Sequence, residues 1–73
     1  MTTRTPKVPW QVSWAGGQWL LQPGDLILVL ERKPLWQAAK IQFRNPSRLE
    51  MPRVLFAIVP TDDLDYHTTL VSA

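Results

Sequence analysis

The chain has 73 residues and no cysteine, and this combination most constrains its fold. At this length a domain is near the lower size limit for an independent core, and many such domains rely on disulfides or bound metals. Disulfides and thiolate metal sites are excluded here, so apolar side chains must supply the stability. Hydrophobic residues make up 45% of the sequence and include four tryptophans. We therefore expect one domain with an aromatic-rich core.

Alternating hydrophobicity predicts a hairpin in the first third of the chain. Trp10, Val12 and Trp14 alternate with polar residues, which is typical of a half-buried strand. Residues 15–17, Ala-Gly-Gly, supply the conformational freedom of a tight reversal. Residues 18–21 are then expected to return as the second strand.

Proline and glycine separate the apolar segments that follow. Residues 22–25, Gln-Pro-Gly-Asp, predict a turn, and the apolar run 26–30 predicts a central strand buried on both faces. Residues 35–43 fit the strand and helix periods equally well, but their short length and strand-like neighbours favour a strand. Residues 54–59 and 66–71 predict two further strands.

This pattern predicts an all-β fold, a small barrel or sandwich of five to six short antiparallel strands. We assign residues 9–73 to this single domain. Residues 1–8 are polar and lack a period, so we expect them to form a flexible or partner-bound arm. Residues 60–64 predict a turn or a short 3₁₀ segment.

The residue types present favour binding over catalysis. The chain has one histidine, His67, no cysteine and no phosphate-binding glycine loop. Asp62, Asp63 and Asp65 lack the spacing of a calcium loop, so we expect them to cap a turn or to pair with nearby cations. We therefore expect a non-enzymatic protein without a cofactor, a metal ion or a small-molecule substrate.

The chain shows no signal for secretion or for membrane insertion. The apolar run 26–30 is far shorter than the ~20 residues of a membrane helix. The first residues carry no apolar run of the signal-peptide type, and the lack of cysteine fits a reducing compartment. The sequence therefore predicts a cytoplasmic protein without a membrane partner.

The net charge is only +2, but the basic residues gather in the middle of the chain, while the acidic residues Asp62, Asp63 and Asp65 follow them. The basic segment in the middle of the chain includes Arg32, Lys33, Lys40, Arg44, Arg48 and Arg53. Two interpretations remain open. The segment forms a polyanion-binding face, or the acidic end neutralises it once the chain folds.

Part of the sequence resembles the opening hairpin of SH3-like small barrels, especially those of the Tudor and PWWP type. Gly24-Asp25 precedes the apolar strand, a charged loop follows, and Trp36, Ala39 and Ile41 lie on the paired segment. The resemblance covers about residues 22–70 and extends to small bacterial and phage proteins that carry such a barrel alone. It implies a non-enzymatic binding module: Tudor and PWWP domains hold methylated side chains in an aromatic cage, and some also hold DNA.

A nucleic acid is the partner that the residues favour. Only Trp36 matches a cage position, with Phe56 and Tyr66 as candidate companions, and Val59-Pro60 stands where the family has an aromatic residue. Basic groups contact phosphates, and interleaved aromatic rings stack on unpaired bases. The predicted binding residues are Arg32, Lys33, Trp36, Lys40, Arg44, Arg48 and Arg53. A solvated basic face with the aromatic residues in the core remains the alternative.

The three N-terminal tryptophans suggest a second function. Trp10, Trp14 and Trp19 precede the barrel-like segment, and tryptophan is enriched at protein interfaces. The alternative function is therefore a structural or adaptor subunit that docks by this hairpin on a protein partner or in a homo-oligomer. An extra hairpin that covers one open end of the barrel explains the same residues equally well.

Overall fold

The computed structural model describes residues 2–44 and 53–71. The elements in chain order are β1 (Thr2–Pro6), β2 (Trp10–Trp14), β3 (Gly17–Leu21), β4 (Ile27–Lys33), the 3₁₀ turn η1 (Pro34–Trp36), β5 (Ala38–Arg44), β6 (Val54–Pro60), α1 (Thr61–His67) and β7 (Thr68–Leu70). Within these residues, no helix is long and apolar enough to cross a membrane.

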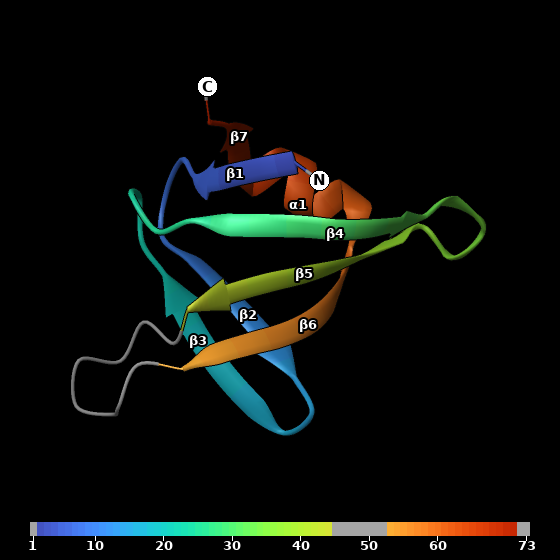
Figure 1. Cartoon of the computed structure of the whole chain (residues 1–73), viewed down its shortest axis with the longest axis horizontal. Helices are drawn as coiled ribbons and strands as arrows, with labels where there is room; N and C mark the ends of the chain where they lie inside the picture. The colour runs from blue at the N-terminus through green and yellow to red at the C-terminus, as the bar shows by residue number, and fades with distance from the viewer. Residues whose placement is uncertain (1, 45–52, 72–73) are drawn as a thin grey trace.

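The strands form two antiparallel sheets, as Figure 1 shows. The larger sheet has the order β6-β5-β4-β1-β7, and β2 and β3 pair only with each other. The predicted β class is confirmed, with one short helix added. The predicted five to six strands become seven in the described ranges, and their hydrogen bonding does not run continuously from one sheet to the other.

The β2–β3 hairpin forms where the sequence predicts it. Ala15 and Gly16 both have positive φ angles, 51° and 80°, which is typical of a type I′ turn. Trp10 pairs with Leu21, and Val12 pairs with Trp19. Directly opposed residues share a face of the hairpin, and this face packs against the larger sheet.

The hydrophobic core lies between this hairpin and the inner face of the larger sheet. Ile41 lies at its centre, paired with Val29 on β4 and with Ala57 on β6. The buried apolar residues are Trp10, Val12, Leu21, Ile27, Val29, Ala39, Ile41, Phe43, Ala57, Val59 and Leu64. The core therefore uses residues from both sheets and from α1.

The ambiguous segment 35–43 is a strand only in its second part. Leu35 and Trp36 belong to η1, and β5 begins after Gln37, whose φ of 51° reverses the chain. Within β5, Ala39, Ile41 and Phe43 are buried in alternation, as the predicted strand pattern requires.

The apolar run 26–30 is buried on one face only. Ile27 and Val29 are buried, whereas Leu28 is half-buried and Leu26 is exposed. The prediction of a strand buried on both faces is therefore wrong. The hairpin covers a single face of the sheet, which leaves the other face of β4 without a second layer.

The described part of the expected N-terminal arm is a strand of the larger sheet. β1 pairs with β4 on one side and with β7 on the other. Arg4 donates hydrogen bonds from Nε to the Thr68 hydroxyl (2.7 Å) and from an Nη to the Thr68 carbonyl (3.0 Å). Pro6 is buried. A polar segment without a period becomes ordered because two neighbouring strands satisfy its backbone.

Residues 61–67 form α1, where the sequence predicts a turn followed by a strand. Asp62 and Asp63 lie in its first turn, where negative charge interacts favourably with the helix dipole. Leu64 is fully buried and attaches the helix to the core. Tertiary packing of Leu64 therefore outweighs the β propensity of Tyr66 and its neighbours.

Candidate functional site: the outer face of the larger sheet

The larger sheet has one face that neither the hairpin nor α1 covers. Side chains alternate across a strand, so residues next to buried Ile41 and Phe43 point away from the core. We define the outer face by the residues of β4, β5 and β6 that point this way. They are Leu28, Glu31, Lys33, Ala38, Lys40, Gln42, Arg44, Val54, Phe56 and Ile58.

Phe56 is the aromatic residue of the outer face. It lies on β6 opposite Gln42, and 49% of its surface is exposed. The Nζ of Lys40, from the adjacent strand, lies 5.6 Å from the centroid of its ring. The exposed ring therefore carries a cation over one of its faces, a combination that suits a planar ligand with negative charge.

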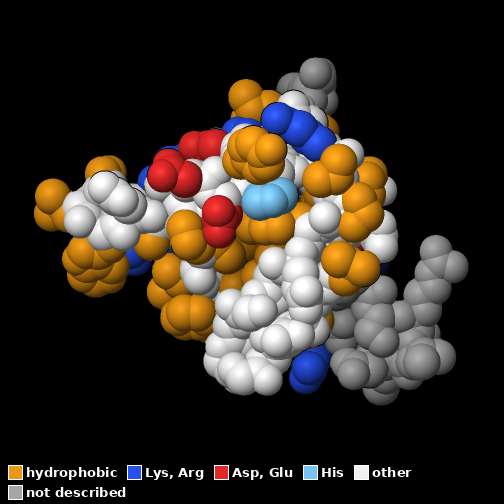
Figure 2. All heavy atoms as spheres, turned by 180° about the vertical axis from the view of Figure 1, so that it is seen from behind, with side chains coloured by type: hydrophobic (Ala, Val, Ile, Leu, Met, Phe, Trp, Pro, Cys, Tyr) orange, Lys and Arg blue, Asp and Glu red, His pale blue; other side chains and the backbone are white. Residues whose placement is uncertain are grey.

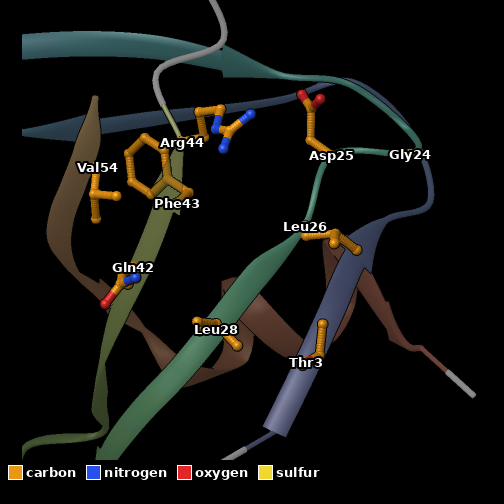
Figure 3. Close-up of a pocket in the computed structure, with 9 residues that line it drawn as sticks. All are labelled: Thr3, Gly24, Asp25, Leu26, Leu28, Gln42, Phe43, Arg44 and Val54. Atoms are coloured by element: carbon orange, nitrogen blue, oxygen red, sulfur yellow. The ribbon is translucent and has the colours of Figure 1, made fainter. Parts of the chain in front are cut away.

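Arg44 borders a hollow at the end of β5. The hollow has a volume of about 600 Å³ and is drawn in Figure 3. Its lining residues are Thr3, Gly24, Asp25, Leu26, Leu28, Gln42, Phe43, Arg44 and Val54. Gln42 lines the hollow and also pairs with Phe56 across the sheet, so the hollow and the exposed ring are contiguous.

The predicted basic set is divided between two faces by an irregularity in β4. The pairing with β5 shifts between Val29 and Glu31, which exchanges the faces of the residues that follow. Arg32 consequently points to the side of α1, where its guanidinium lies 3.0 Å from the Asp65 carboxylate. The hydrogen bond from Arg32 lowers the pKa of Asp65, and burial opposes this shift only in part. For Arg32, the second interpretation of the basic segment therefore holds: an acidic residue near the end of the chain neutralises its charge.

Lys33 and Trp36 lie at the tip of the β4–β5 hairpin. The Lys33 ammonium lies 3.3 Å from the Glu31 carboxylate and 5.0 Å from the centroid of the Trp36 indole. Trp36 is 71% exposed, and Leu35 beside it is 97% exposed. The tip is thus apolar. Lys33, the cation beside it, is already paired with Glu31.

Lys40 and Arg44 are the predicted basic residues that the outer face presents without an acidic partner in the described ranges. Arg53 is exposed and immediately precedes β6. Arg48 lies outside the described residues. The structure therefore brings Lys40 and Arg44 together with Phe56, and it places Arg32 elsewhere.

The tryptophan trio is used mainly for packing. Trp10 is only 6% exposed, and its ring stacks on that of His67 with the centroids 5.7 Å apart. Trp19 is half-buried and meets Phe43 edge to face at 5.8 Å. Trp14 is 41% exposed. Of the three, Trp14 has the most surface for a partner, and the hairpin as a whole covers the core.

Three acidic residues, Asp62, Asp63 and Asp65, lie on α1, on the side of the molecule opposite to the outer face, whereas Glu31 belongs to the outer face itself. Figure 2 shows the domain from behind, with the carboxylates of α1 close to His67. Because α1 packs through Leu64 on the inner side of the sheet, its charges point away from Lys40 and Arg44. The carboxylates of α1 are therefore separated from the cations of the outer face.

Sequence reasoning undervalued Phe56 and missed Gln42 as site residues. Both faces of β6 are apolar, with Val54, Phe56 and Ile58 on one face and Leu55, Ala57 and Val59 on the other. A period-two pattern cannot show which of two apolar faces is inside.

No known protein family, curated protein or solved structure matches the chain, so the functional argument rests on this geometry.

Proposed function

We propose that this domain binds single-stranded nucleic acid on the outer face of the larger sheet. The observation that carries the proposal is the exposed ring of Phe56, with the Lys40 ammonium over it, on an uncovered sheet face. An aromatic ring on such a face stacks on an unpaired base, while the cation contacts the adjoining phosphate.

Charge distribution supports this choice of partner. Lys40 and Arg44 keep their charges available on the outer face, whereas Arg32 and Lys33 are paired with acids. The carboxylates of α1 lie on the other side of the molecule and would repel a phosphate backbone that approached there. A polyanion is therefore directed to the outer face.

The expected energies follow from these contacts. Stacking of one base on an aromatic side chain contributes about 1–3 kcal/mol. Two phosphate contacts, one each from Lys40 and Arg44, give a slope of about −1.4 for log K against log salt concentration, because each contact on a single strand contributes roughly −0.7. We expect weak binding that is strongest at low salt.

Fluorescence anisotropy with a labelled oligonucleotide tests the proposal. Phe56→Ala should weaken binding of a single strand by about 5- to 150-fold, which corresponds to the loss of one stacked base. Tyr66→Ala is the matched control, because Tyr66 is 77% exposed on α1, away from the outer face. Equal effects of the two substitutions, or equal affinity for a duplex and a single strand, would contradict the proposal.

A second candidate, docking on a protein partner, is favoured by the hairpin tip rather than by Trp10 and Trp19. The tip is fixed by two backbone hydrogen bonds, from Gln37 N–H to the Pro34 carbonyl (3.1 Å) and from Thr61 N–H to the Gln37 carbonyl (3.0 Å). Leu35 and Trp36 are thus held in place while exposed to solvent.

Light scattering distinguishes the homo-oligomeric form of this second function. A homo-oligomer that Leu35→Ser and Trp36→Ser dissociate together would support docking of the tip on another copy. A monomer at all concentrations would exclude that form.

A further inference from the structure

We propose that the hollow beside Arg44 is a nucleobase subsite that selects guanine. This inference rests on the proposed function and adds a base preference to it. The hollow lies within the range of about 300–1,000 Å³ that is typical of ligand pockets. It combines one carboxylate, one guanidinium and one amide with apolar walls, and Figure 3 shows their arrangement.

The carboxylate of Asp25 is fixed by the turn that precedes β4. Its Oδ2 accepts a hydrogen bond from the Gln22 N–H at 2.8 Å, and the Asp25 N–H donates to the Gln22 carbonyl at 3.0 Å. Gly24, with a φ of 100°, donates its N–H to the Thr5 hydroxyl at 3.0 Å. The turn is therefore tied both to itself and to β1. It leaves Oδ1 and the second lone pair of Oδ2 of Asp25 able to accept hydrogen bonds from a ligand.

Arg44 places a guanidinium at the same end of the hollow as Asp25 (Figure 3). Arg44 and Asp25 form no ion pair with each other, and the Arg44 side chain has no hydrogen-bonding or ionic partner among residues 2–44 and 53–71. Two opposite charges that border one hollow without pairing are arranged for a ligand that offers both donors and acceptors.

The walls of the hollow are apolar and uncovered. Leu26 is 59% exposed and Val54 is 52% exposed, although both are aliphatic and belong to the lining. Leu28 is half-buried and also belongs to the lining. A flat ring placed here would remove this apolar surface from water, which favours binding by about 25 cal/mol per Å².

Guanine matches the polar groups better than the other bases do. Its adjacent N1–H and N2–H groups are two donors for a carboxylate, and its O6 and N7 are two acceptors for the fork of an arginine. Adenine offers the carboxylate one amino group and places a ring acceptor beside it. Uracil places carbonyl oxygens on both sides of its single N–H. A carboxylate beside those acceptors is repelled, so Asp25 discriminates against them.

The test compares uridine tracts that carry one central guanosine, adenosine, cytidine or inosine, titrated into the whole chain at low salt. We expect guanosine to bind about 5- to 150-fold more tightly than adenosine or cytidine, the discrimination of one bidentate contact. Inosine lacks the N2 amino group and should lose part of this preference. A 7-deazaguanosine probe lacks the N7 acceptor of the Arg44 contact and should lose another part.

Two variants locate the preference. Asp25→Asn keeps an oxygen for the Gln22 N–H but replaces the second acceptor with a donor, so the guanosine preference should vanish while affinity for the plain tract stays equal or rises. Arg44→Lys keeps the charge but loses the fork, and it should reduce the preference while retaining the salt dependence. Asp63→Asn on α1 is the control and should leave the preference unchanged, and circular dichroism verifies that each variant folds.

The outcomes separate the subsite from the proposed function. Binding of the guanosine, adenosine, cytidine and inosine tracts with equal affinity overturns the guanine subsite and leaves single-strand binding intact. A guanosine preference that survives both Asp25→Asn and Arg44→Lys also overturns the subsite, since the selecting groups must then lie elsewhere. No binding of any probe overturns both. A preference that disappears in Asp25→Asn and persists in Asp63→Asn supports the proposal.

Discussion

Replacement of Gly17 by alanine tests the packing of the β2–β3 hairpin. The Trp19 ring lies over Gly17, and an added Cβ would lie 2.6 Å from Cζ2 of the indole and 3.2 Å from its Cζ3. Ordinary contact begins at 3.4 Å, so the ring must move by about 1 Å. The same ring contacts the buried Phe43 edge to face, and the movement disturbs this contact.

The expected destabilisation is the difference between two effects. Overpacking costs about 1–3 kcal/mol, which includes the disturbed aromatic pair. Alanine in place of glycine within a strand recovers roughly 0.5–1 kcal/mol of conformational entropy. We expect Gly17→Ala to lower the free energy of unfolding by about 1–2 kcal/mol, and the melting temperature by roughly 4–16 °C for a domain of this size.

Thermal unfolding followed by far-ultraviolet circular dichroism measures this effect without relying on tryptophan emission. The control is the same substitution in a Trp19→Ala background, where the ring is absent. There Gly17→Ala should be neutral or slightly stabilising, so its sign changes between the two backgrounds. Equal destabilisation in both backgrounds would refute the steric argument.

Three further effects follow from burial and charge. Leu64→Ala should destabilise the domain by about 2–5 kcal/mol in urea unfolding, because this side chain is fully buried and attaches α1 to the core. Leu35→Ser should change the free energy of unfolding by less than about 0.5 kcal/mol in the same assay, because Leu35 is 97% exposed. The lowered pKa of Asp65 makes its ion pair with Arg32 stabilising above the ordinary value of 3.8, and this contribution is lost as the pH falls through the folded-state pKa. Arg32→Gln should remove most of that pH dependence in acid titrations of stability, because only the weaker attraction of Arg4 to Asp65 remains, and its cost at neutral pH should be below about 1 kcal/mol because the pair is exposed.

Local patterns identified the elements whose signal is contained within a few residues. The turn at Ala15 and Gly16 requires positive φ angles, and the glycine pair at positions 16 and 17 indicates such a reversal, although Ala15 rather than Gly17 adopts the second positive φ. The strand predicted within residues 35–43 is confirmed for β5, where Ala39, Ile41 and Phe43 alternate on the inner face. In both cases local chemistry and tertiary packing favour the same conformation.

Features that depend on distant contacts could not be derived in this way. β1 carries no apolar period because it is ordered by pairing with β4 and β7. α1 forms because Leu64 fills a place in the core, which is visible only after the sheet is assembled.

Which basic residues reach the candidate site is decided by one such feature, the irregularity in the pairing of β4 with β5. The irregularity between Val29 and Glu31 moves Arg32 to the inner side and Lys33 to the outer face. From composition alone the two residues are equivalent members of a basic segment. Phe56 likewise belongs to an apolar strand whose exposed side is decided by the position of the hairpin.

The most direct test of single-strand binding on the outer face is a ¹H–¹⁵N correlation spectrum titrated with a short uridine-tract oligonucleotide at low salt. We predict that the amide signals of Lys40, Gln42, Arg44 and Phe56 shift together and saturate, and that those of α1 stay in place. Shifts confined to α1 or to the hairpin around Trp14, or a spectrum unchanged by the oligonucleotide, would contradict the account.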